Sequence, residues 1–185
     1  MNYTYPHKIE NFLGEKITIL ERKKETHGDR LIVESYTAPG VGPVMHTHWL
    51  QDESLTVVKG TIGYQVKGQS ERFAKEGETI LFSKGTPHRF WNAGKETLYC
   101  RGYIKPAHSI EFFLTSIFEA QNKARSKEPE PFDAAFLLTK YSSEFDLTEI
   151  PVFVKKAILP LMCIFGKLLG KYKHFKNAPP AVKSI

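Results

Sequence analysis

Over the first hundred residues, apolar and polar positions alternate in short runs that turn residues separate. Runs at 16–22 and 30–37 are rich in β-formers, and the segment around Gly28 between them predicts a hairpin. The later runs cover 43–49, 53–60, 61–68, 71–83, 86–92 and 96–104. Glycines recur between them every eight to nine residues or so, as is typical of an all-β sandwich or barrel. No strand–helix–strand rhythm is present, so a parallel sheet is not expected.

After Pro106 the apolar period becomes helical, which predicts an amphipathic helix over about 109–124. A charged, proline-containing linker at 126–131 precedes a short second helix over 132–141. Residues 146–149 resemble a capping box ahead of Pro151, and they predict a third helix over 151–173 with a kink near Pro160. The pattern thus predicts a β-barrel over residues 1–105 and a helical C-terminal extension over 106–185 that packs on the barrel or on a partner subunit.

The net charge of +6 and the isoelectric point near 9.2 are unevenly distributed. Residues 1–149 hold 19 of the 26 basic residues against all 20 acidic ones, so this part is nearly neutral. The excess consists of lysines after Glu149, where no acid occurs: Lys155, Lys156, Lys167, Lys171, Lys173, Lys176 and Lys183. No docking motif for DNA or RNA accompanies them, so we expect no nucleic-acid partner.

Three features favour a cytoplasmic protein. Cys100 and Cys163 are too few for a disulfide framework, which favours a reducing compartment. The N-terminal residues show no basic region followed by an apolar run, so no secretory signal is expected. The longest apolar stretch, residues 157–166, is too short to span a bilayer.

Four residues carry the candidate chemistry. His46 and His48 stand two apart in a strand context, so their imidazoles project from one face. Glu53 follows after enough chain for a turn, and His88 begins another β-run. Three imidazoles and a carboxylate suit divalent Zn, Fe, Mn, Ni, Cu or Co better than Ca or Mg.

The spacing around these residues resembles that of the cupin superfamily. The stretch GVGPVMHTHWLQDESLTVVKG, residues 40–60, matches the first cupin motif at every spaced position. The stretch GETILFSKGTPHRFWN, residues 77–92, matches the second, except that Ser83 replaces a proline that stiffens a turn. The resemblance extends over nearly the whole chain, to single-domain cupins with a helical C-terminal extension.

The resemblance implies a jelly-roll barrel that forms a homodimer, with His46, His48, Glu53 and His88 as ligands of one divalent transition metal ion. Such a site predicts a metal-dependent enzyme, dioxygenase-like or isomerase-like, that acts on a small organic molecule. Glu53 is a candidate base. A non-catalytic barrel that binds a small ligand, or one that a metal only stiffens, is the alternative.

For the remaining candidate residues, a structural role is weighed against a functional one. Tyr64, Phe82 and Phe90 share inward strand positions, where core packing is favoured over contact with a substrate. Arg101 is a candidate for binding a substrate carboxylate, although a surface position is favoured. For the basic third helix, packing is favoured over contact with an anionic membrane surface.

Overall fold

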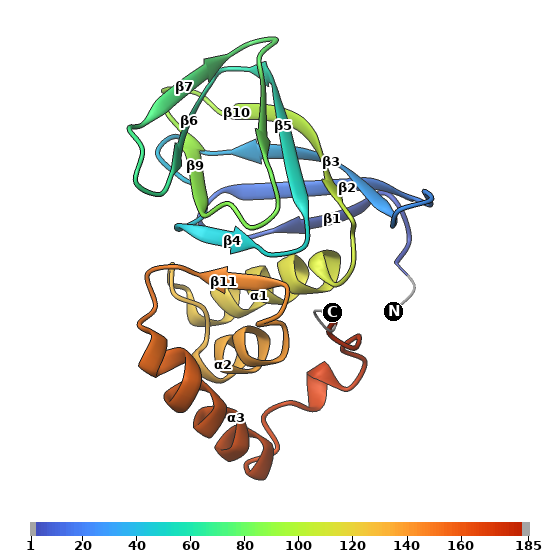
Figure 1. Cartoon of the computed structure of the whole chain (residues 1–185), viewed down its shortest axis with the longest axis vertical. Coiled ribbons are helices and arrows are strands. Elements are labelled where there is room, and N and C mark those ends of the chain that lie inside the picture. Colours follow the sequence, from blue (N-terminus) through green and yellow to red (C-terminus); the bar gives the residue numbers. More distant parts are fainter. Residues whose placement is uncertain (1–2, 183–185) are drawn as a thin grey trace.

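The computed structural model describes residues 3–182, and two facing antiparallel sheets form one half of it (Figure 1). The larger sheet has the strand order β1-β2-β3-β10-β5-β8, and the smaller has the order β11-β4-β9-β6-β7. The strands are β1 (His7–Glu10), β2 (Glu15–Lys23), β3 (Arg30–Thr37), β4 (His46–His48), β5 (Asp52–Lys59), β6 (Thr61–Val66), β7 (Arg72–Lys75), β8 (Thr79–Phe82), β9 (His88–Asn92), β10 (Leu98–Lys105) and β11 (Phe145–Leu147). This is the jelly-roll arrangement that the sequence predicts.

The predicted strands are present, and β2 pairs with β3 as the expected antiparallel hairpin. Between the sheets, alternate residues of each strand form an apolar core that includes Leu55, Val57, Ile62 and Phe82. The sequence analysis missed β1 and β11. Each has at most four residues, which is too short for alternation to be recognised.

Helices form the other half of the molecule. The first two are α1 (Ile110–Ala124) and α2 (Pro131–Lys140), each within about a residue of its predicted start. Pro131 occupies the first turn of α2, and the Glu130 carboxylate accepts a hydrogen bond from the amide of Asp133 at 2.9 Å.

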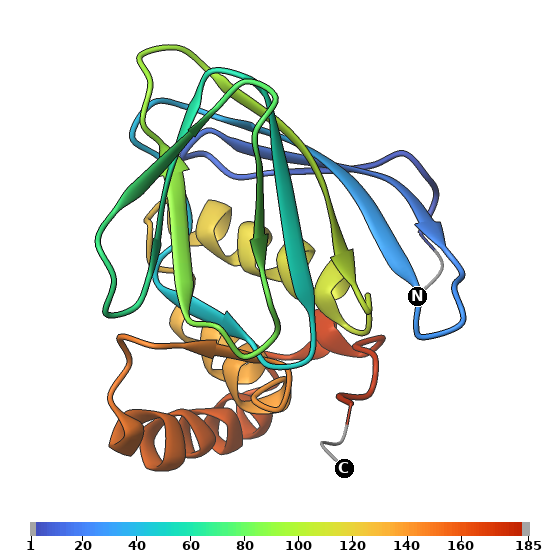
Figure 2. The ribbon, with the colours of Figure 1, turned by 45° about the horizontal axis from the view of Figure 1, so that its top comes forward.

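The helix α1 fills the space between the two sheets at one end of the sandwich (Figure 2). Leu98, Cys100 and Ile104 lie on one face of β10, at alternating positions. The first two pack in the core between the sheets, whereas Ile104 packs with Phe112 and Phe113 of α1. The strand β10 therefore contributes to two core clusters, one between the sheets and one against the helical extension.

The predicted capping box at residues 146–149 is wrong. Asp146 lies in β11, and its carboxylate accepts hydrogen bonds from Nζ of Lys155 at 2.7 and 2.9 Å instead of capping a helix. Residue identity alone does not distinguish these uses, because a carboxylate accepts from an amide or an ammonium group equally well.

The third helix is shorter than predicted. A π-helical turn, η1 (Val154–Ile158), leads into α3 (Leu159–Leu168), and a short 3-10 helix, η2 (Lys173–Phe175), follows. The wider π-turn lies just before Pro160, whose nitrogen carries no hydrogen to donate. The helix ends because Gly170 adopts a left-handed conformation (φ +66°) and the amide of Lys171 donates to the carbonyl of Gly166 at 2.9 Å.

The third helix does not pack on the barrel, which is one of the two favoured arrangements; its packing on a partner subunit stays a prediction. The helix α3 packs on α2, at the end of the molecule away from the sheets (Figure 1). Only Leu159 and Gly166 of α3 are buried. Among the described residues, no helix is both long and apolar enough to cross a membrane.

Candidate metal centre

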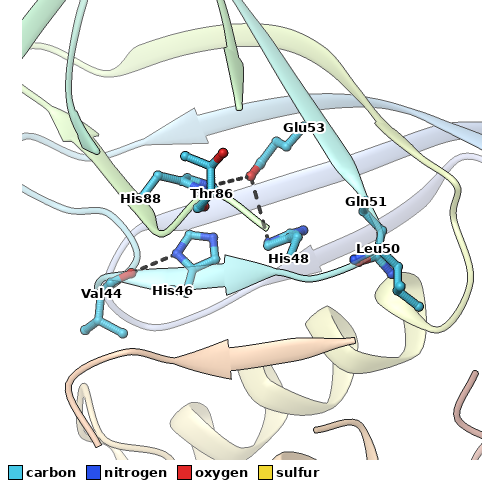
Figure 3. A network of polar contacts seen from close by, with 8 residues as sticks. All are labelled: Val44, His46, His48, Leu50, Gln51, Glu53, Thr86 and His88. Atoms are coloured by element: carbon cyan, nitrogen blue, oxygen red, sulfur yellow. Dashed lines mark hydrogen bonds and ion pairs between the residues drawn. The ribbon is translucent and has the colours of Figure 1, made fainter. Parts of the chain in front are cut away.

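Three strands bring the four predicted ligands together (Figure 3). His46 and His48 project from the same side of β4, and His46 faces His88 of β9 in the strand register. Glu53 approaches from β5 of the opposite sheet. One donor atom from each residue lies within 4.8 Å of the others. In the described part of the chain, this is the one such cluster of histidine, cysteine and acidic residues.

Backbone carbonyl groups orient two of the imidazoles. Nδ1 of His46 donates a hydrogen bond to the carbonyl oxygen of Val44, and Nδ1 of His88 donates to that of Thr86, both at 2.8 Å (Figure 3). A carbonyl oxygen only accepts, so Nδ1 carries the proton in both rings. In the neutral form of either ring, Nε2 then keeps its lone pair for a ligand, as is usual for histidines that bind metals.

The contact between His88 and Glu53 tests whether a cation fits. Nε2 of His88 lies 3.1 Å from Oε2 of Glu53, and Nε2 of His48 lies 3.9 Å from the same oxygen. A carboxylate oxygen only accepts, so this contact needs either a proton on Nε2 of His88 or a cation between the two atoms. Two ligand atoms at right angles, with bonds of about 2.1 Å, stand about 3.0 Å apart. The observed spacing therefore fits a shared metal ion.

Burial gives these groups the charges that metal binding needs. It lowers the pKa of His46 to about 3, with His48 and His88 adding to the shift. Burial also lowers the pKa of His48 to about 4, against the opposing effect of Glu53. Burial alone raises the pKa of Glu53, but the contact with His88 and the nearby imidazoles outweigh it and bring the pKa to about 2. At neutral pH, His46 and His48 are neutral and Glu53 is ionised, so both kinds of donor are available.

One polar atom in the cluster is unsatisfied. Nδ1 of His48 is buried and has no hydrogen-bond partner among the described residues. A buried polar group of this kind is costly unless another interaction compensates for it. A metal ion bound at Nε2 of His48 would fix the ring but would leave Nδ1 without a partner, so this atom does not bear on metal binding.

Aromatic rings form one wall of the cluster. Phe82 stacks on His88 with ring centroids 3.9 Å apart and an interplanar angle of 10°. Phe90 and Tyr64 lie next to Phe82, at centroid distances of 6.4 and 6.1 Å. The three predicted pocket residues are thus gathered beside the ligands. Phe82 is fully buried, whereas Tyr64 and Phe90 are partly buried.

Arg101 is not part of this site. Its side chain is 65% exposed on the outer face of β10, where Nε donates to Oε1 of Glu34 at 2.9 Å and to Oη of Tyr99 at 2.8 Å. Its neighbour Cys100 points into the core instead, because successive residues of a strand face opposite ways. The prediction that Arg101 binds a substrate carboxylate in the barrel does not fit this geometry.

The sequence analysis missed the contribution of β11. This strand pairs antiparallel with β4, and Phe145 lies opposite His48. Next to it, the buried carboxylate of Glu144 accepts a hydrogen bond from Nε2 of Gln51 at 3.0 Å. Residues far apart in sequence thus support the strand that carries two of the predicted ligands. No local sequence motif predicts this contact.

Comparison with known proteins agrees with this architecture. The family model described as "Cupin domain" matches residues 34–100, which include all four predicted ligands. "Oxidoreductase iacF" of Pestalotiopsis fici is 27% identical over 111 residues, which make up 55% of this chain and 54% of that protein. The chain thus spans about half the length of this curated relative.

Solved structures with a similar fold are more distant in sequence. KdgF from Halomonas sp. is 17% identical, with a TM-score of 0.49 over 57% of this chain and 92% of that one. A conserved protein with a double-stranded β-helix domain from Klebsiella pneumoniae is 18% identical, with a TM-score of 0.46 over 52% of this chain and 81% of that one. The family match and the strand topology together show that the chain carries a cupin domain with a jelly-roll fold.

Proposed function

We propose that this protein is a metal-dependent enzyme, dioxygenase-like or isomerase-like, that acts on a small organic molecule. The observation that carries the proposal is the convergence of His46, His48, Glu53 and His88 within 4.8 Å. The relative from Pestalotiopsis fici, which is named an oxidoreductase, supports the redox version.

In this proposal, the four residues hold one divalent ion of Zn, Fe, Mn, Ni, Cu or Co. When bound, the ion supplies a Lewis acid with coordination positions left for a substrate oxygen. The carbonyls of Val44 and Thr86 keep two imidazoles correctly oriented, and Glu53 contributes the negative charge. Because Oε2 of Glu53 faces two imidazole nitrogens, we assign this residue to ligation and not to base catalysis.

The aromatic wall and the strand β4 frame the substrate side. Phe82, Phe90 and Tyr64 present an apolar surface beside the ligands, which excludes water and favours an organic molecule. Of the four ligands, His46 is the one that is partly exposed, so access from solvent is expected on its side.

Elemental analysis of protein purified without a chelating tag tests the metal site. We expect about one transition metal ion per chain, the H46Q/H88Q variant to lose it, and the H27Q variant, which changes an exposed histidine, to retain it. Metal-free protein should regain thermal stability when the right ion is added. A protein that retains no metal, and whose melting temperature ignores every added ion, would contradict the proposal.

A mass-spectrometric screen tests the reaction class. The metal-loaded protein is incubated in air with small organic molecules that raise its melting temperature. A product that has gained oxygen indicates an oxygenase, and an isomer of unchanged mass indicates an isomerase. Turnover must disappear in H46Q/H88Q and persist in H27Q.

The second candidate is a non-catalytic barrel that a metal stiffens or that only binds a small ligand. The burial of His48, Glu53 and His88 and the stacking of Phe82 on His88 favour it, because tight packing suits a structural ion. Stoichiometric zinc that raises the melting temperature, with no turnover in the screen, would support this candidate over the enzyme.

We also propose that residues 1–105 form the barrel domain, that residues 106–185 form its helical extension, and that the protein acts as a cytoplasmic homodimer. Cys100 and Cys163 are both free, as a reducing compartment implies. The edge strands β7 and β8 expose Phe73 and Leu81, which pairing with a second copy would cover. Sedimentation analysis of the wild type and of F73S/L81S tests the dimer.

A further inference from the structure

The solvent side of α3 is apolar. Leu161, Ile164, Phe165 and Leu168 are 52%, 56%, 59% and 77% exposed. Their spacing of three, four and seven residues places them along one stripe of the helix. The buried residues Leu159 and Gly166 lie on the opposite side, against α2 and Tyr172. The helix therefore turns its larger apolar face outward.

More exposed apolar residues adjoin this stripe. Val152 and Phe153 just before η1 and Leu169 just after α3 are each more than half exposed. Single exposed apolar residues are ordinary on a protein surface, but a contiguous group marks an interaction site. We call Leu161, Ile164, Phe165 and Leu168 the apolar stripe.

The charged residues that follow Glu149 in the sequence, on α3 and beside it, are all lysines. Among the described residues after Glu149, the exposed lysines without an ion pair are Lys156, Lys167, Lys171, Lys173 and Lys176. Lys155 differs, because Asp146 neutralises it at 2.7 Å. No acidic residue occurs after Glu149. An apolar stripe with lysines beside it and without acids complements a surface that is apolar inside and negatively charged outside.

We propose that α3 binds the surface of an anionic phospholipid bilayer. The apolar stripe enters the boundary between headgroups and acyl chains, and the lysines contact the phosphates and carboxylates of the headgroups. The helix lies flat on the bilayer, because its 10 residues are too few to span it. Its position at the end of the molecule, away from the sheets, lets a flat surface reach it without meeting the barrel (Figure 1).

A second copy of this chain fits the stripe less well. A two-fold contact between two copies of α3 would bring lysines of one copy close to lysines of the other, and like charges at an interface are unfavourable. An anionic bilayer instead offers opposite charge along the whole helix. Because of this charge complementarity, we favour an anionic bilayer over a second copy as the partner of the apolar stripe.

Vesicle flotation with the full chain tests the proposal. Vesicles of phosphatidylcholine with about one third phosphatidylserine are compared with pure phosphatidylcholine vesicles at near-physiological salt. We expect binding to the anionic vesicles that high salt weakens. The F165S/L168S and K167E/K171E variants should each bind at least about tenfold more weakly. All four side chains are exposed, so the fold should be retained, which circular dichroism checks.

Matched controls distinguish binding through α3 from nonspecific hydrophobic or electrostatic binding by other parts of the surface. F12S/V58S removes two exposed apolar side chains from the barrel half, and K24E/K95E reverses two exposed lysines there. Both should bind like the wild type. Equal binding of all variants, no binding to anionic vesicles, or an α3-dependent dimer without vesicle binding would each overturn the proposal. None of these results depends on metal or turnover, so the outcome does not affect the test of the proposed enzyme function.

Discussion

The ring of Phe145 lies edge-on against the imidazole of His48, with centroids 5.6 Å apart and ring planes at 78°. The same two residues face each other in the register of β11 and β4. Phe145 also contacts Phe113 of α1 at a centroid distance of 4.4 Å. The C-terminal extension thus reaches the candidate metal centre directly, through one side chain that links a ligand to the helical core.

Replacing Phe145 by leucine should loosen His48. We expect F145L to lower the free energy of unfolding by about 1 kcal/mol and to weaken metal affinity by up to about tenfold, because the ring no longer supports the imidazole. Competition with a chelator measures the affinity. F175L is the control, because this buried phenylalanine packs on Phe112 and Phe136, away from the predicted ligands. It should lower the free energy of unfolding without lowering the metal affinity. Equal loss of affinity in both variants would contradict a positioning role.

The buried carboxylate of Glu144 should be essential for joining barrel, helix and tail. Its Oε2 accepts from Gln51 and from the amide of Ser109 before α1, and Oε1 accepts from the amide of Val182. In E144Q, an NH₂ group would face one of these donors, so we expect a loss of about 2 to 3 kcal/mol in the free energy of unfolding. Urea unfolding measures it. The exposed Glu149 supplies the control, since E149Q should leave the free energy of unfolding unchanged. An E144Q variant as stable as the wild type would show that the network contributes little.

A chain that ends at Lys105 should fail to fold alone. Ile19, Leu31 and Ile104 would lose their packing against α1, and β4 would lose its partner β11. We expect an aggregated or unfolded product by gel filtration and circular dichroism, and recovery when residues 106–185 are co-expressed as a separate chain. A stable, monomeric 1–105 fragment would show instead that the barrel is an independent domain.

Cys100 should resist alkylation. Burial raises the pKa of its thiol to about 12, so only about one molecule in ten thousand carries the thiolate at pH 8. Cys163 is only half-buried and should react first. Iodoacetamide labelling should therefore modify C100S but hardly C163S, and denaturant should make both react. Above pH 8, the labelling of C163S should accelerate about tenfold per unit until the pKa is reached, provided that the fold persists. Fast labelling of native C163S at pH 8 would contradict the burial.

The candidate ligands were readable from the sequence because their information is local. His46 and His48 stand at a spacing that places both on one side of a strand, and the glycine-bounded motifs fix where Glu53 and His88 fall. The hairpin before them and the first two helices were readable for the same reason, since each period extends over enough residues to be recognised.

The orientation of Arg101 was not readable. In β10, Tyr99 and Tyr103 lie on one face and Cys100 and Ile104 on the other, so both faces carry large or apolar residues. Alternation separates two faces of a strand but does not say which one meets the core when neither is clearly polar.

The sequence by itself thus determined the cupin barrel, the four candidate ligands and the helical character of the C-terminal part. Only the tertiary structure decided that β11 pairs with β4, that Phe145 supports His48 and that the apolar stripe of α3 faces solvent. The physical reason is the range of the interactions. Periodicity and motif spacing act between neighbours in the chain, whereas these three features depend on which distant surfaces meet.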